Sequence, residues 1–151
     1  MSSQLRDLTY EDLDQILLIE QDLFGITAWS RELFLDEISR LGSSRWYKVL
    51  WENDRIIGYV GMAITGSSAD IQTIAVISDK QRAGYGAQLL ELALAKAQEL
   101  GVTQLFLEVA VENEAAIKLY QRFGFEQISI RPNYYGAGRN AFVMMRPIGA
   151  R

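Results

Sequence analysis

The chain has 151 residues, of which 49% are hydrophobic and 23% are charged, and its formal net charge is −4. This composition is ordinary for a folded globular protein, and the length predicts a single domain over residues 1–151. There is no cysteine and no histidine, which excludes disulfides, a cysteine nucleophile, the usual zinc sites and a Ser-His-Asp triad. Any proton transfer must therefore use carboxylates, tyrosines, lysines or water, and no metal is expected.

Charge and hydropathy patterns also limit the partners and the location of the protein. The mixed, slightly acidic charge argues against nucleic-acid binding. No apolar run approaches the roughly 18 residues of a membrane span, and residues 1–6 lack the hydrophobic segment of a secretory signal. We therefore expect a cytoplasmic protein that binds neither nucleic acid nor membrane.

The first part of the chain predicts a strand, two helices and a β-hairpin, in that order. Thr9 can cap the first helix, and Ser30 can cap the second. Turn-favouring residues at 52–54 separate two β-rich runs, which is typical of a hairpin. The predicted ranges are a strand at 5–8, helices at 13–23 and 31–41, and strands at 46–51 and 55–64.

The next stretch predicts a strand at 71–76, a glycine-bearing loop at 81–86 and a helix at 87–100. Backbone N–H groups at a helix start lack intrahelical partners and lie at the positive end of the helix dipole, so this junction can bind a phosphate. Gly84 and Gly86 lack the Cβ that would hold a ligand's oxygens away from those groups. A loop that only needs a flexible backbone is the alternative interpretation.

The residues after this loop argue against two common nucleotide-binding motifs. A Walker loop needs Lys and Ser or Thr after the last glycine, where this chain has Ala87 and Gln88. A dinucleotide fingerprint needs a third glycine where this chain has Leu89. The pattern that is left is Gln-x-x-Gly-x-Gly, which by itself does not identify the phosphate ligand.

The last third predicts a strand, a helix and two further strands. Asn113 can cap the helix and Gly124 can end it. Residues 105–107 are all apolar, as in a strand that is buried on both faces. The predicted ranges are a strand at 102–111, a helix at 114–123, and strands at 125–130 and 141–146 around a polar loop at 131–140. The element order β-α-α-β-β-β-α-β-α-β-β indicates a mixed α/β fold with one crossover helix between adjacent parallel strands.

Three polar residues in this last third are candidates for chemistry. Glu108 interrupts an apolar strand near its carboxyl end, where ligands collect in open α/β sheets. Tyr120 lies two helical turns after Asn113, so both can face one cleft. Each has a plainer alternative: Glu108 as a solvated or arginine-paired glutamate, Tyr120 as core packing, and Asn113 as a helix cap and nothing more.

Two motifs in this element context resemble the GNAT superfamily of acetyl-CoA-dependent N-acetyltransferases. They are Gln81-x-x-Gly84-x-Gly86 and Asn113-x-Ala115-Ala116-Ile117-x-Leu119-Tyr120-x-x-x-Gly124-Phe125. More narrowly, Ile74-Ala75-Val76, Leu107-Glu108-Val109 and Arg131-x-Asn133-Tyr134-Tyr135 are similar to bacterial RimI-type ribosomal-protein-alanine N-acetyltransferases. The resemblance implies the GNAT fold, an α/β fold with a mixed, mostly antiparallel sheet, a central parallel strand pair and helices on both faces.

The resemblance also implies roles for individual residues. It makes Glu108 the proton acceptor and Tyr120 the proton donor. Trp29, Tyr134 and Tyr135 would bind the acceptor, and no metal would take part. Acetyl-CoA would be the co-substrate, with its pyrophosphate on the glycine loop and its pantetheine arm along the preceding strand. The residues that would bind it are Ile74, Ala75, Val76, Arg82, Ala83, Gly84, Tyr85, Gly86, Ala87 and Asn113.

The implied reaction is direct acetyl transfer to the N-terminal α-amino group of a protein, foremost the N-terminal alanine of a ribosomal protein. A lysine or small-molecule acetyltransferase and a non-catalytic acyl-CoA-binding module are the alternatives. Some relatives associate with the tRNA threonylcarbamoyladenosine machinery, which implies a tRNA-modification protein as a candidate partner. Relatives commonly have proline where this chain has Ala28, and an acidic pair where it has Arg139-Asn140, which weakens complementarity to a basic acceptor tail.

Overall fold

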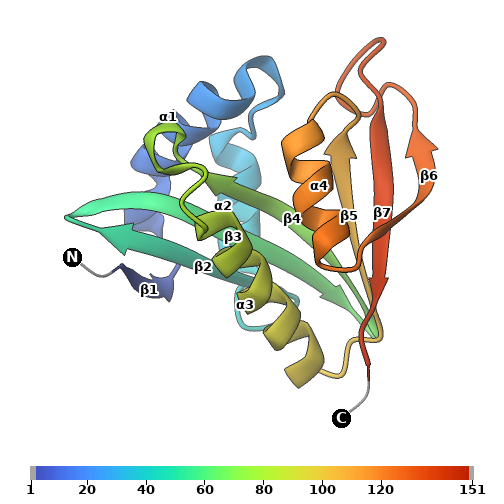
Figure 1. Cartoon of the computed structure of the whole chain (residues 1–151). Coiled ribbons are helices and arrows are strands. Elements are labelled where there is room, and N and C mark those ends of the chain that lie inside the picture. Colours follow the sequence, from blue (N-terminus) through green and yellow to red (C-terminus); the bar gives the residue numbers. More distant parts are fainter. Residues whose placement is uncertain (1–2, 150–151) are drawn as a thin grey trace. The chain divides into compact units, whose positions relative to one another are not determined.

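The computed structural model describes residues 3–149 and has the predicted mixed α/β architecture. Within this range there are seven strands, in the order β1-β2-β3-β4-β5-β7-β6, and four α-helices (Figure 1). The strands are β1 (Gln4–Asp7), β2 (Arg45–Glu52), β3 (Arg55–Thr65), β4 (Ser68–Val76), β5 (Gln104–Ala110), β6 (Glu126–Arg131) and β7 (Ala141–Pro147). The helices are α1 (Leu13–Phe24), α2 (Arg31–Ser39), α3 (Tyr85–Glu99) and α4 (Glu114–Arg122).

The predicted parallel pair is confirmed: β4 and β5 run parallel, with Asp70 opposite Phe106. The pairs β1·β2, β2·β3, β5·β7 and β6·β7 are antiparallel. No helix within residues 3–149 is both long and apolar enough to cross a membrane.

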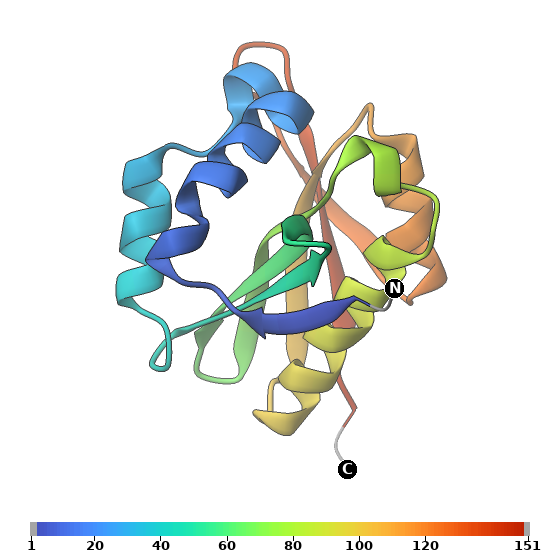
Figure 2. The same cartoon turned by 90° about the vertical axis from the view of Figure 1, so that its left-hand side faces the viewer.

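The chain divides into two compact units, which are described separately. The first contains the residues up to Ala63 together with Gln72–Ala93, and the second contains Ile64–Ile71 together with the residues from Leu94 onward. In the first unit, α1 and α2 lie side by side (Figure 2). In the second unit, β5, β7 and β6 lie next to one another in this order (Figure 1).

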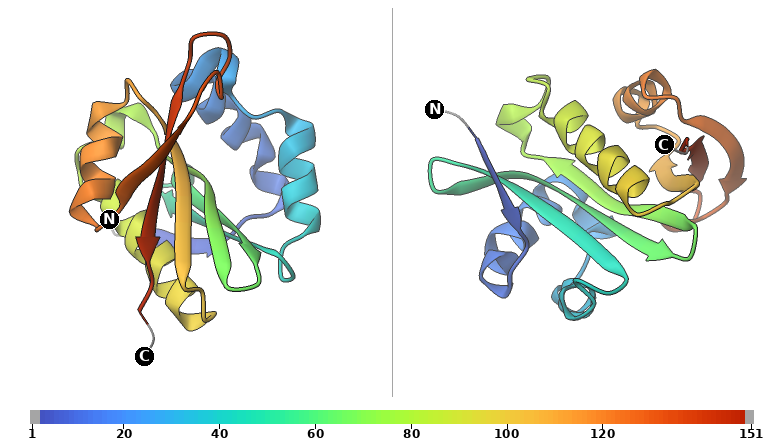
Figure 3. Two further views of the ribbon diagram at one scale, coloured as in Figure 1. Left: turned by 90° about the vertical axis from the view of Figure 1, so that its right-hand side faces the viewer. Right: turned by 90° about the horizontal axis from the view of Figure 1, so that it is seen from below.

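In the first unit, helices cover both faces of β3 because neighbouring strand residues point to opposite sides. On one face, the Tyr59 hydroxyl donates to Glu20 of α1 over 2.6 Å, and its ring centroid lies 6.4 Å from that of Phe34 of α2. On the other face, a Cβ at Gly58 would lie 3.1 Å from Leu89 of α3. Figure 3 (right) shows α1 and α2 on one side of β2 and β3 and the start of α3 on the other.

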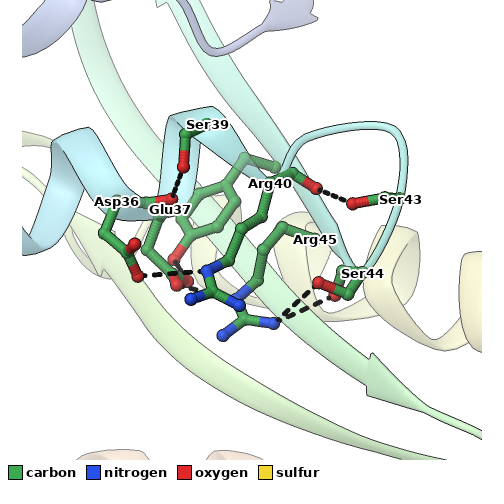
Figure 4. Close-up of polar contacts among 8 residues, drawn as sticks. Asp36, Glu37, Ser39, Arg40, Ser43, Ser44 and Arg45 are labelled. Carbon is green, nitrogen blue, oxygen red and sulfur yellow. Dashed lines mark hydrogen bonds and ion pairs between the residues drawn. The ribbon is translucent and has the colours of Figure 1, made fainter.

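The core of the first unit contains a buried carboxylate with two donors. Glu37 of α2 is 5% exposed; it accepts a hydrogen bond from the Tyr47 hydroxyl over 2.6 Å and from Arg45 Nε over 2.7 Å. Figure 4 shows Glu37 and Arg45 together, with the ion pair of Asp36 and Arg40 beside them. A buried charge without such partners would cost several kcal/mol, so this cluster ties α2 to the start of β2.

In the second unit, β5 alternates between a buried and a partly open face. Leu105, Leu107 and Val109 are buried, whereas Phe106 and Glu108 are only partly buried. The prediction that residues 105–107 are buried on both faces is therefore wrong for Phe106. The physical reason is that Phe106 shares its sheet face with Glu108, and that face keeps access to solvent.

Two predicted boundaries change in ways that affect the site. The strand predicted at 71–76 begins at Ser68, because Gly66, with a φ of 60°, allows β3 to turn tightly into β4. The helix predicted from residue 87 begins at Tyr85, so Tyr85 and Gly86 form its first turn rather than the loop. Asp70 thus belongs to a strand and not to a connection.

The close approach of the Tyr47 ring to the backbone of β3 explains why residue 61 is a glycine. Gly61 of β3 lies opposite Tyr47 of β2. A Cβ at this position would lie 2.0 Å from Cε2 of the Tyr47 ring, which is closer than any real contact. The ring therefore occupies the volume that a side chain at position 61 would need.

We expect Gly61→Ala to lower the free energy of unfolding by about 3 kcal/mol, because the added methyl group must displace the Tyr47 ring and disturb its bond to Glu37. Urea unfolding monitored by circular dichroism would measure the change. Gly149→Ala is the matched control, since a Cβ there meets nothing within 4 Å. Equal unfolding midpoints for the two variants would contradict the prediction.

Candidate functional site

The carboxylate of Glu108 lies on the partly open face of β5, and the strand fixes its direction. Glu108 pairs with Val143 of β7 in a register that covers all seven residues of β5. Partial burial raises the pKa of Glu108, and the negative charge of Asp70 raises it further. The positive charge of Arg131 and a hydrogen bond from Tyr134 act in the opposite direction. A carboxyl group with a raised pKa is a stronger base once ionised, as a proton acceptor requires.

The loop after β6 brings two tyrosines to this carboxylate. The Tyr134 hydroxyl donates to Glu108 Oε1 over 3.4 Å. The Arg131 guanidinium stacks over the Tyr134 ring at 4.3 Å from its centroid. The rings of Tyr134 and Tyr135 meet edge to face, with centroids 4.8 Å apart. The sequence predicted Glu108, Tyr134 and Tyr135 as site residues, and the structure brings them together.

Two asparagines hold the shape of this loop. Asn133, with a φ of 58°, donates its backbone N–H to Asn140 Oδ1 over 3.0 Å. Asn133 Oδ1 in turn accepts from the backbone of Gly138 over 2.7 Å. The side chain of Asn140 thus closes the loop that carries Tyr134, a role that the sequence motif does not indicate.

Tyr120 of α4 is buried and keeps its proton at neutral pH. Its side chain is 6% exposed, and its ring lies edge to face on Phe125 with centroids 5.9 Å apart. Burial, and to a smaller extent the Tyr135 hydroxyl, raises the pKa of Tyr120 well above its usual range. Burial likewise raises the pKa of Tyr135, to about 12. The Tyr120 phenol therefore stays protonated but is a weaker acid than an exposed tyrosine, and its contact with Phe125 is ordinary core packing.

Asn113 is the cap of α4. Its Oδ1 accepts a hydrogen bond from the backbone N–H of Ala116 over 3.2 Å, which satisfies one of the free donors at the helix start. This cap is sufficient reason for an asparagine at this position. A contact between Asn113 and the cofactor stays a prediction.

In the first unit, the glycine loop has the backbone of an anion-binding turn. Gly84 has a φ of 89°, a conformation that side chains disfavour, and the first helical bond of α3 runs from Gln88 N–H to Gly84 O. The N–H groups of Tyr85, Gly86 and Ala87 precede that bond, so they are the unpartnered first-turn donors expected of a phosphate seat. The loop also contains Arg82 and Ala83, which were predicted to bind the cofactor.

Side chains outside the motif fix this loop at both ends. Gln81 Nε2 donates to the carbonyl of Val76 over 2.9 Å, which ties the loop to the end of β4. Glu52, at the end of β2, is paired with Lys80 before the loop over 2.9 Å and accepts from the Tyr85 hydroxyl after it over 3.2 Å. No local pattern in the sequence indicates this role of Glu52, because only the fold brings it to Tyr85, which lies 33 residues further along the chain.

The remaining predicted residues of the first unit lie on β4 and between α1 and α2. Ile74, Ala75 and Val76 form the carboxyl end of β4. Trp29 is partly buried, and the centroid of its ring lies 5.2 Å from that of Phe34. Its backbone N–H donates a hydrogen bond to Glu20 Oε1 over 2.9 Å. Glu20 is itself buried, and this burial raises its pKa. Glu20 therefore fixes the backbone at Trp29, a role that the sequence did not suggest.

Sequence reasoning also missed two charged residues near Glu108. Asp70 lies just before the strand predicted at 71–76, so the sequence does not place it beside β5. Arg131 belongs to a sequence motif, but its stacking on Tyr134 depends on the fold of the loop. The alternation of apolar Ala69 and Ile71 around a carboxylate is a local signal that identifies Asp70 as a strand residue.

Known proteins with similar sequences identify the family to which this chain belongs. Residues 10–125 match the model of the acetyltransferase (GNAT) family. The ribosomal protein bS18-alanine N-acetyltransferase of Escherichia coli (strain K12) is 34% identical over 147 residues, which cover 95% of this chain and 97% of that protein. A longer protein of Mycobacterium leprae is 34% identical over 145 residues, which cover 92% of this chain and 39% of that protein.

Two solved structures are similar over almost their whole length. The ribosomal-protein-S18-alanine N-acetyltransferase of Escherichia coli has a TM-score of 0.86 and 32% identity, with 99% of this chain and 96% of that chain covered. Ard1 from Thermoplasma volcanium has a TM-score of 0.89 and 25% identity, with 99% of both chains covered.

The chain therefore belongs to the acetyltransferase (GNAT) family. Within this family it is similar to the RimI-type enzymes, and it is an acetyl-CoA-dependent N-acetyltransferase.

The hydrogen bond from Tyr134 to Glu108 is expected to influence the pKa of the Glu108 carboxyl group. Because a donor stabilises the ionised form, Tyr134→Phe should raise the pKa of Glu108. Carbon-13 NMR of the glutamate carboxyl signals, assigned with Glu108→Gln, would measure this change. Tyr10→Phe, on an exposed tyrosine of the first unit, should leave the titration unchanged. A Glu108 pKa that is unchanged or lowered in Tyr134→Phe would contradict the interpretation.

Proposed function

We propose that the protein transfers the acetyl group of acetyl-CoA to the N-terminal α-amino group of a protein. The observation that carries this proposal is the Tyr134–Glu108 hydrogen bond, which joins the proposed base to the loop proposed to bind the acceptor. We propose Glu108 and Tyr120 as the catalytic residues, and Trp29, Tyr134 and Tyr135 as acceptor-binding residues.

The strength of a single carboxylate base favours an α-amino acceptor over a lysine. An α-amino group with a pKa near 8 is about one quarter neutral at pH 7.5, whereas a lysine near 10.4 is only about 0.1% neutral. The difference in the free energy of deprotonation is about 3 kcal/mol. Glu108, whose pKa is raised, therefore has to offset a smaller free energy of deprotonation when the acceptor is an N-terminus than when it is a lysine.

The proposed reaction needs no acyl-enzyme intermediate. The acceptor ammonium group gives one proton to Glu108, and the neutral amine attacks the thioester carbonyl carbon. A new N–C bond forms as the C–S bond breaks. The thiolate leaves and takes a proton from Tyr120, which regains one when the amide nitrogen loses its second proton. The products are the acetylated N-terminus, free coenzyme A and one proton, which Glu108 releases to solvent.

The proposed binding of acetyl-CoA uses the backbone of the first unit. The pyrophosphate would accept from the first-turn N–H groups of α3, next to Gly84 and Arg82, and the pantetheine arm would lie along residues 74–76. An N–H on that strand would also stabilise the negative charge that develops on the thioester oxygen. Acetyl-CoA would supply the thioester, and the chain would supply hydrogen-bond donors, orientation and the two proton-transfer groups.

Ribosomal protein bS18 is the acceptor named for the Escherichia coli relative. We propose that the acceptor of this chain is likewise the N-terminal alanine of a ribosomal protein. The 34% sequence identity to that relative, which extends over 95% of this chain, supports this proposal. The association with a tRNA-modification protein stays a prediction from resemblance.

Coenzyme A release from acetyl-CoA, measured with four short peptides, would test the acceptor class. The peptides are a basic one that begins with alanine, one that begins with methionine, an acidic one, and an N-blocked peptide with an internal lysine. We expect preferential turnover of the alanine peptide. Turnover of the blocked peptide alone would establish lysine acetylation instead, and silence despite acetyl-CoA binding would contradict the proposed function.

The same assay tests the two catalytic residues. With the alanine peptide, we expect Glu108→Gln to lower kcat/KM about 100-fold or more and Tyr120→Phe about 10- to 100-fold, because each removes a proton-transfer group and keeps the side-chain volume. Unchanged turnover in Tyr120→Phe would assign Tyr120 to core packing. Near-normal kcat/KM across the pH range in Glu108→Gln would exclude Glu108 as the base.

A matched pair of glycine variants tests the cofactor loop. Gly84→Ala and Gly101→Ala both place a side chain at a positive φ, of 89° and 77°, with no atom within 4 Å of the new Cβ. Each should cost about 1–2 kcal/mol of stability, but only Gly84→Ala should weaken coenzyme A binding, by about tenfold, in titration calorimetry. Equal affinities for coenzyme A would show that the loop does not bind the pyrophosphate.

A further inference from the structure

In the first unit, the end of the β2–β3 hairpin contacts the segment before the cofactor loop through two ion pairs. The two residues of the hairpin turn, 53–54, both have positive φ, of 53° and 60°, as tight hairpin turns require. Glu52 and Arg55 pair across this turn. Glu52 Oε1 lies 2.9 Å from Lys80 Nζ, and Arg55 Nη2 lies 3.0 Å from Asp79 Oδ2. A rigid turn therefore presents both charges to one short segment.

The two ion pairs differ in burial and in the number of their partners. The side chain of Glu52 is 6% exposed, whereas those of Arg55 and Asp79 are 46% and 64% exposed. The second carboxylate oxygen of Glu52 accepts from the Tyr85 hydroxyl over 3.2 Å. The hydrogen bond from Lys80 is the main reason that the pKa of Glu52 is lowered, and Tyr85 adds to it against the effect of desolvation. Glu52 is therefore ionised and bonded through both oxygens at neutral pH.

The loop between these two partners has a backbone that needs support. Arg82 has a φ of 67°, which is disfavoured for a residue with a side chain. Such a conformation persists where the surrounding structure holds it, and it is common at ligand-binding sites. Lys80 and Tyr85 flank loop residues 81–84, and both bond to one carboxylate. Glu52 thus connects the two ends of the loop and limits the conformations that it can adopt.

The ion pair also bears on the role of Lys80. A lysine next to a phosphate-binding loop would ordinarily be assigned as a phosphate ligand. Lys80 is instead paired with Glu52, and this pairing raises the pKa of Lys80. A carboxylate this close to the loop would repel a phosphate if no cation neutralised it. Lys80 supplies the neutralising charge.

We propose that Glu52 is a positioning residue for acetyl-CoA, which holds the first-turn N–H groups of α3 in place for the pyrophosphate, and that Lys80 is its counter-ion and not a phosphate ligand. This inference rests on the proposed binding of the pyrophosphate at the glycine loop. Glu52 touches neither reacting group; it acts through Tyr85 and Lys80 on the backbone between them. A loop that is ordered before the cofactor arrives loses less conformational entropy on binding.

Titration calorimetry with coenzyme A measures this role without the chemical step. We expect Glu52→Gln to weaken binding about 5-fold, because charge-assisted hydrogen bonds that order the loop are lost. Tyr85→Phe keeps the ring but removes one donor, and it should weaken binding about 3-fold. Asp79→Asn is the matched control: it breaks the exposed ion pair of the same segment and should leave the affinity unchanged. Thermal melting would check that each variant is folded.

The sign of the change in Glu52→Gln separates the two possible roles of Lys80. If Lys80 bound the pyrophosphate, loss of the competing carboxylate would free this lysine and remove a repulsive charge, so coenzyme A would bind more tightly. Positioning by Glu52 predicts weaker binding. Lys80→Met should weaken binding further, about 30-fold, because it leaves Glu52 without a counter-ion. Adding Glu52→Gln to Lys80→Met should then restore the affinity to that of Glu52→Gln alone.

Steady-state kinetics give a readout that a general loss of stability would not reproduce. With the alanine peptide, Glu52→Gln should raise the KM for acetyl-CoA about 5-fold and leave kcat within about twofold of the wild type. Unchanged or tighter coenzyme A binding in Glu52→Gln would overturn this inference alone, as would a double variant that binds as weakly as Lys80→Met. Unchanged coenzyme A affinity in Gly84→Ala would overturn the proposed pyrophosphate site and the inference together.

Discussion

The pairing of β5 with β7 is the constraint on which the geometry around Glu108 depends. All seven residues of β5 are in register with β7, so Glu108 cannot turn to the other face without breaking the whole ladder. Strand β7 also pairs with β6, where Ala141 is opposite Arg131. The loop that carries Tyr134 therefore leaves and re-enters the sheet next to the end of β5.

Hydrogen bonds across long sequence separations then set the chemistry of this face. Tyr134 donates a hydrogen bond to Glu108 from 26 residues away, and Asp70, opposite Phe106 on the neighbouring parallel strand, acts on Glu108 through its charge. Burial and Asp70 raise the pKa of Glu108, whereas Arg131 and Tyr134 lower it. The proton affinity of Glu108 is thus a balance of four influences from different elements, which is how a carboxyl group is adjusted toward the pKa of its substrate.

In the first unit, hydrogen bonds from distant residues to buried carboxylates stabilise the fold. Two of its buried carboxylates show this: Glu37 accepts from Tyr47 and Arg45, and Glu20 accepts from Tyr59 and the backbone of Trp29. These bonds offset the desolvation of the acids and connect both N-terminal helices to the strands beneath them. The glycine loop is held in a similar way by Glu52 and Gln81, so a segment rich in flexible residues becomes an ordered donor surface.

The sequence by itself determined the order of elements, the parallel pair, the cap of α4 and the family, because periodicity, turn residues and motif spacing are local properties of the chain. It also proposed Glu108, Tyr134 and Tyr135, since the motifs name residue types at fixed spacings. Only the tertiary structure decided that Tyr134 bonds to Glu108, that Asp70 belongs to β4 and shares its face with Glu108, and that Glu52 and Glu20 position the loops. These contacts join residues far apart in the sequence, and their energies come from burial and from charges that meet only when the strands pair.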